Sequence, residues 1–140
     1  MKNKGGGSLR VVLDTNVLIS AILWDGSVAQ KMLYNFIERD VEIFSSVAAL
    51  QEFQNVLKRD FDYNADAVEQ ITEILFTFIK LIEPNEKLEV VKDDPDDNKI
   101  LECAIASSSD YIISYDKHLT SIDTFRGIKI IRPNDALRLF

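Results

Sequence analysis

Short, mainly apolar runs recur along the chain and alternate with stretches whose apolar residues follow helical spacing. A run without polar alternation is typical of a strand buried on both faces of a parallel sheet. The predicted strands are residues 11–13, 41–44, 88–91, 110–114 and 128–131. The predicted helices are residues 17–23, 28–38, 47–58, 65–81, 95–106 and 134–140. This alternation predicts a single-domain α/β fold of three layers, with helices on both faces of a central parallel sheet of four to five strands.

The length and composition suit one soluble domain. Residues 1–8 are rich in glycine and predict a flexible lead, which leaves residues 9–140 as the expected domain. No apolar run approaches the ~20 residues of a membrane span, and the lead lacks the apolar core of a signal peptide. We therefore expect a cytoplasmic protein with no membrane association. Cys103 is the only cysteine, which excludes an internal disulfide and a thiolate metal site.

The chain is acidic, with a formal net charge of -7. A protein that coats nucleic acid by bulk electrostatics usually carries a basic excess, so this balance argues against such binding. It does not exclude an enzyme that acts on a phosphodiester through bound cations. The placement of the acids therefore matters more than their sum.

Two acids follow predicted strands. Asp14 comes directly after the first strand, at the edge of the sheet where open α/β folds bind their ligands. Asp116 stands in the same relation to the fourth strand, after Ser114 and Tyr115. A structural role explains Asp14 equally well, because Asp14, Thr15 or Asn16 can cap the helix that follows.

Two further acids lie on predicted helices. Glu52 falls at the border of an apolar stripe formed by Val47, Leu50, Phe53 and Leu57. Asp97 precedes Leu101 by four residues and so begins the apolar face of its helix. It belongs to an acidic run, Asp93 to Asn98, in which we interpret Asp94, Asp96 and Asn98 as capping or supporting residues.

The four acids are expected to converge, because the carboxyl ends of parallel strands meet at one edge of the sheet. Crowded carboxylates repel one another and suit Mg²⁺ or Mn²⁺, which prefer oxygen ligands. The lone histidine, His118, is interpreted as a surface residue. The sequence has no Gly-x-Gly-x-x-Gly motif and no Walker loop, so a nucleotide-binding fold is unsupported.

The order and spacing of these segments resemble a PIN-domain ribonuclease. The marks are Val-Val-Leu-Asp14-Thr-Asn16, Glu52, Asp94-Pro-Asp-Asp97-Asn98 and Ser114-Tyr-Asp116. The likeness covers Leu9 to Leu139, although Tyr115 stands where small residues are common in the family. No single mark is specific alone.

The resemblance implies a Mg²⁺- or Mn²⁺-dependent endoribonuclease, of the kind that acts as the toxin of a toxin-antitoxin pair. Its catalytic and metal-binding acids would be Asp14, Glu52, Asp97 and Asp116, with Asn16 and Ser114 as supporting polar residues. The implied partners are RNA, an antitoxin protein and a second copy of the chain. Candidate substrate-guiding cations and partner-facing aromatic residues are Lys99, Lys117, Arg126, Lys129, Trp24, Phe61 and Tyr63.

Three rival interpretations fit parts of the sequence. A phosphoacceptor receiver domain needs an acceptor aspartate where the second strand instead ends in Phe44-Ser45. A haloacid-dehalogenase-type phosphatase needs a second aspartate where Asn16 stands. A catalytically silent PIN-like module that binds RNA or protein keeps the acids without turnover, and the sequence leaves it open.

Overall fold

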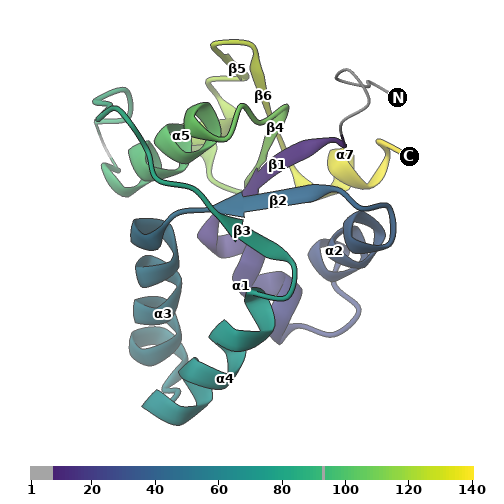
Figure 1. The fold of residues 1–140 in the computed structure, drawn as a ribbon, viewed down its shortest axis with the longest axis vertical. Coiled ribbons are helices and arrows are strands. Elements are labelled where there is room, and N and C mark those ends of the chain that lie inside the picture. Colours follow the sequence, from purple (N-terminus) through teal and green to yellow (C-terminus); the bar gives the residue numbers. More distant parts are fainter. Residues whose placement is uncertain (1–7, 93) are drawn as a thin grey trace.

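The computed structural model describes residues 8–92 and 94–140. Asp93 of the acidic run and residues 1–7 of the predicted lead lie outside the described residues. One mixed sheet of six strands forms the centre, in the order β3-β2-β1-β4-β6-β5 (Figure 1). The strands are β1 (Arg10–Leu13), β2 (Glu42–Ser45), β3 (Ile79–Leu81), β4 (Tyr111–Ile113), β5 (Thr124–Phe125) and β6 (Ile128–Ile131). All neighbours pair in parallel except β5 and β6, which are antiparallel.

Helices cover both faces of the sheet, which confirms the predicted three-layer α/β/α architecture. The helices are α1 (Thr15–Leu23), α2 (Val28–Glu38), α3 (Val47–Phe61), α4 (Ala65–Leu75), α5 (Asp96–Ala106), α6 (Lys117–Thr120) and α7 (Pro133–Leu137). Val11 and Leu13 of β1 pack into the core beneath α1 and α2, whereas Val12 packs into the core beneath α5. Since alternate side chains of a strand point to opposite faces, a strand buried on both sides must be apolar throughout.

The third strand lies at a different place from the one predicted. Residues 65–81 were expected to form one helix, but α4 ends at Leu75 and β3 pairs with β2 through Ile79 and Ile43. The apolar spacing of residues 76–82 fits either element, and the open edge of β2 decides between them. The sheet thus gains an edge strand from a predicted helix.

Residues 88–91, predicted as a strand, form none, because side chains of α5 take their backbone hydrogen bonds. The Asn98 amide oxygen accepts from the N–H groups of Val90 and Val91 at 3.0 and 2.9 Å. The Asn98 Nδ2 donates to the Val91 carbonyl at 2.9 Å, and Glu102 accepts from the Leu88 N–H at 2.8 Å. The segment is therefore fixed to α5 and not to the sheet.

Strand β5 has no counterpart among the predicted strands; with β3 gained and residues 88–91 lost, the described sheet has six strands instead of four to five. It forms a hairpin with β6 across Arg126 and Gly127, whose φ angles are 50° and 82°. Two consecutive positive φ angles match the tight turns that two-residue hairpins favour. The strand is only two residues long, too short for a periodic signal.

Replacing Asn98 by alanine is expected to lower the free energy of unfolding by about 2–4 kcal/mol, because several buried backbone groups would lose their partner. Thermal or urea unfolding measures the change. Asn85→Ala, at an exposed position, serves as the control and should change stability by no more than about 0.5 kcal/mol. A loss for Asn98→Ala no larger than the control would contradict the clamping role.

Candidate metal centre

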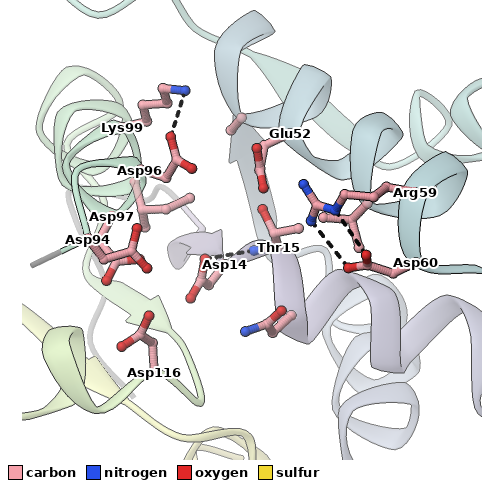
Figure 2. A pocket seen from close by; sticks show the side chains of 14 residues that line it. Asp14, Thr15, Glu52, Arg59, Asp60, Asp94, Asp96, Asp97, Lys99 and Asp116 are labelled. Atoms are coloured by element: carbon pink, nitrogen blue, oxygen red, sulfur yellow. Dashed lines mark hydrogen bonds and ion pairs between the residues drawn. The ribbon is translucent and has the colours of Figure 1, made fainter.

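A cavity of about 170 Å³ lies at the carboxyl ends of β1 and β4, between α3 and α5. Asp14 follows β1, and Asp116 follows β4, its parallel neighbour. Figure 2 shows acidic side chains gathered around the opening from several elements. The acids that line it are Asp14, Glu52, Asp60, Asp94, Asp96, Asp97 and Asp116.

Asp14 is buried and held by two hydrogen bonds. Its Oδ1 accepts from the backbone N–H of Thr15 at 2.8 Å, which caps α1, and its Oδ2 accepts from the Ser114 hydroxyl at 2.6 Å. Burial raises the pKa of Asp14, the two hydrogen bonds oppose that rise, and the nearby charges of Asp116 and Asp94 add to it. Capping and placement at the cavity are thus combined in one side chain.

Asp97 is buried at the edge of the cavity. It is only 5% exposed, and no N–H or hydroxyl group of the described residues donates a hydrogen bond to its buried Oδ2. Burial, a hydrogen bond with Asp116, and the charges of Asp14, Asp116 and Asp94 raise the pKa of Asp97 to about 8. In the absence of a cation, the carboxyl group therefore keeps its proton at neutral pH.

The tightest group of possible metal ligands differs from the expected four acids. One oxygen each from Asp94, Asp97 and Asp116 and a ring nitrogen of His118 all lie within 4.8 Å of one another. His118 is exposed, as expected, but its Nδ1 lies 3.4 Å from the Asp116 Oδ1. Asp94, interpreted as a capping or supporting residue, also belongs to this group, and no side chain in the described part of the chain caps α5.

The other expected residues take different places. Glu52 lines the cavity from α3, where it stands apart from the α5 acids in Figure 2. Asn16 lines the cavity as an exposed residue. Ser114 is fully buried, and its hydroxyl joins the two strand-end acids, since it donates to Asp14 and accepts from the Asp116 N–H at 2.9 Å.

The sequence carried a weak signal for Asp94 and His118. Each lies within three residues of an expected ligand, but a helix-start acid and a lone histidine have common structural explanations.

Val47, expected on the apolar stripe of α3, is 51% exposed because α3 begins there, beyond the core.

The donor set fits a divalent cation. Carboxylate oxygens are the ligands that Mg²⁺ and Mn²⁺ prefer, and an imidazole nitrogen suits transition metals. The Asp97 Oδ2 supports the same conclusion, because no described residue donates to it, and the ionised group is costly there unless a cation lies beside it.

The chain is similar in sequence to a known domain family and to an archaeal protein. A sequence profile of the PIN domain matches residues 10–118. The uncharacterized protein MJ1680 of Methanocaldococcus jannaschii is 30% identical over 127 residues, which are 87% of this chain and 81% of that protein.

Two solved structures share the fold. The crystal structure of VapBC2 from Rickettsia felis bound to a DNA fragment from their promoter matches with a TM-score of 0.65 and 15% identity, over 89% of this chain and 98% of that chain. PAE2754 from Pyrobaculum aerophilum matches with a TM-score of 0.58 and 16% identity, over 92% and 87% of the two chains.

The raised pKa of Asp97 predicts how the stability of the metal-free protein depends on pH. The carboxyl group titrates near 3.8 when unfolded and at about 8 when folded, so the folded state binds more protons between these values. Its stabilising contribution is therefore complete below about pH 3.8 and is lost as the pH rises through about 8. In EDTA, the Tm of the wild type should fall relative to that of Asp97→Asn between pH 5 and 8.5, by roughly 3 °C for each kcal/mol lost.

Differential scanning calorimetry of both proteins across that range measures the effect. Parallel Tm profiles for the wild type and Asp97→Asn would show that the folded Asp97 has no raised pKa.

Proposed function

The chain belongs to the PIN-domain family, and from that premise we propose that it is a metal-dependent endoribonuclease with its nuclease domain in residues 9–140. The observation that carries the proposal is the unpartnered, buried Oδ2 of Asp97 within a cluster of carboxylates at the cavity. A divalent ion held there would supply a Lewis acid for the scissile phosphate and would lower the pKa of an attacking water.

The residues of the chain have separate tasks in this proposal. Asp94, Asp97 and Asp116, joined by His118, would hold the ion, because their ligand atoms lie within 4.8 Å of one another. Asp14 would bind on the adjacent side, with its orientation set by the Ser114 hydroxyl and the Thr15 N–H. Glu52, on the α3 wall, would accept a hydrogen bond from a water molecule in the cavity, and Asn16 would contact water or phosphate at the opening.

A silent binding module is supported less well. Such a protein needs no buried carboxylate without a partner, and the acids of this cavity repel a phosphodiester unless a cation intervenes. A bound metal ion would account for the buried position of Asp97, and hydrolysis of a phosphodiester is a use for such an ion.

The biological setting is a further part of the proposal. We place the protein in the cytoplasm as the toxin of a toxin-antitoxin pair, inhibited by a protein partner and assembled as a homodimer. The fold shared with VapBC2 of Rickettsia felis supports this assignment. No helix in residues 8–92 or 94–140 has the length and apolar character needed to traverse a bilayer.

Exposed apolar side chains offer surfaces for such partners. Trp24 is 47% exposed and contacts Phe61 edge to face, with 5.4 Å between the ring centroids. Phe61 and Tyr63 are half-buried against the core and contribute less to the exposed apolar surface. Other exposed apolar residues are Tyr34, Ile37, Val47, Ile74, Phe76, Leu81 and Val90.

Cleavage of labelled RNA by the purified protein tests the catalytic proposal. Products should form with Mg²⁺ or Mn²⁺ and disappear in EDTA, and Asp14→Asn and Asp116→Asn should each lower the rate by about 100-fold or more. Asp66→Asn, an exposed acid on α4 remote from the cavity lining, is the matched control and should cleave like the wild type. Products that persist in the Asp14 and Asp116 variants would identify a contaminating nuclease.

The place of His118 in the cluster predicts a preference for Mn²⁺. Imidazole binds transition metals better than it binds Mg²⁺, so His118→Ala should weaken Mn²⁺ binding by about tenfold and Mg²⁺ binding much less. Isothermal titration calorimetry with each ion measures both changes. Equal losses for the two ions would mean that His118 is not a ligand.

A further inference from the structure

The wall of the acidic cavity also carries a cation that is not a metal ligand. Arg59, in the last turn of α3, lines the same cavity as the acids. In Figure 2 it lies on the α3 side, with Asp14 and Thr15 between it and the group formed by Asp94, Asp97 and Asp116. We propose that Arg59 is a phosphate-binding residue that holds a phosphodiester of the RNA strand next to the bond that is cleaved. This inference rests on the proposed function.

Arg59 is oriented by its neighbour Asp60. The Nε donates to the Asp60 Oδ1 at 2.9 Å and one Nη donates to the Oδ2 at 3.2 Å, a two-bond fork that matches the planar guanidinium. A guanidinium carries five N–H donors, so three remain after these two bonds. Among the described residues they have no further acceptor, while the side chain is 63% exposed. The free edge can therefore accept a ligand.

The charge balance of the cavity makes this donor edge important. Seven carboxylates line the opening, and the only cations among its described lining residues are Arg59 and Lys99. The Lys99 Nζ is bound to Asp96 at 3.0 Å, with its single point of charge directed to that carboxylate. Both cations keep unused donors after their ion pairs form, but only the guanidinium of Arg59 presents them in a fixed plane that matches two phosphate oxygens. A phosphodiester that approaches this acidic cavity is repelled by the unpaired acids, so a preoriented guanidinium beside them lowers the barrier to binding.

A purely structural role for Arg59 makes different predictions. A cation in the last turn of a helix interacts favourably with the helix dipole, and an exposed ion pair contributes little to stability. In that case, removing Arg59 would lower the affinity for RNA no more than removing any nearby positive charge.

Lys58 provides the matched comparison. It carries the same charge in the same turn of α3 and is exposed, but it does not line the cavity. Because neighbouring helix residues point about 100° apart, the two side chains serve different surfaces. A difference in RNA affinity between their alanine variants therefore reflects the position of the side chain and not the net charge.

The test measures the affinity of the full chain for a labelled single-stranded RNA of about a dozen nucleotides. Fluorescence anisotropy is recorded with Ca²⁺ in place of Mg²⁺, over a series of KCl concentrations. Arg59→Ala should raise the Kd about tenfold more than Lys58→Ala does and should reduce the slope of log Kd against log salt by about 0.7, the loss of one phosphate contact on a single strand. Arg59→Lys should fall between the wild type and Arg59→Ala, because lysine keeps the charge but loses the fork.

Two controls separate this inference from the proposed function. Calorimetric titration with Mn²⁺ should show that the metal affinity of Arg59→Ala does not fall, so a loss of RNA binding is not a loss of the ion. If the wild type cleaves RNA with metal but Arg59→Ala and Lys58→Ala have the same Kd and salt slope, the role of Arg59 is wrong and the nuclease stands. If the wild type neither binds nor cleaves RNA, both proposals are wrong.

Discussion

The structure depends on the parallel pairing of β1 with β4. Leu13 lies opposite Ile113, the Asp14 N–H donates to the Ile113 carbonyl at 2.9 Å, and the Ser114 hydroxyl donates to the Asp14 carboxylate. Because parallel strands end at the same edge, two acids that are about a hundred residues apart in the sequence face one cavity. Ser114 then links them directly, since it contacts both Asp14 and the backbone of Asp116.

This convergence works against the stability of the metal-free protein. Asp97 has a buried oxygen without a partner and a pKa raised to about 8, and burial also raises the pKa of Asp14. Burial and the neighbouring acids disfavour the ionised forms of both groups, and a cation bound as proposed would favour them. If the site binds a cation as proposed, metal affinity and folding stability would be coupled, because the ligands must lose protons before they bind an ion.

The positions of Asp94 and Asp97 depend on how α5 is fixed to the segment before it. The segment before it has no partner strand, and the side chains of Asn98 and Glu102 satisfy its backbone instead. The same helix presents Asp97, and Asp94 lies just before its first turn. The acid cluster is thus held partly by side-chain contacts to a loop, and a change in that loop would move the acids without any change in the sheet.

The order of apolar runs and helical stretches determined the α/β class, and the acids that follow β1 and β4 could be named as candidates from the sequence alone. Periodicity could not locate β3, because apolar residues near the end of a helix fit both patterns, and it could not exclude a strand at residues 88–91, because a short apolar run also fits a buried loop. The open edge of β2 and the amide of Asn98 decided these two cases.

The roles within the cavity were also decided by tertiary structure. Asp94 and His118 join the tightest cluster, Glu52 stands on the opposite wall, and Arg59 faces the acids, although all four have ordinary explanations as single residues. A sequence records which groups are present. Distance, burial and the presence or absence of a hydrogen-bond partner depend on segments far apart in the chain, and these set the electrostatic free energy of each group.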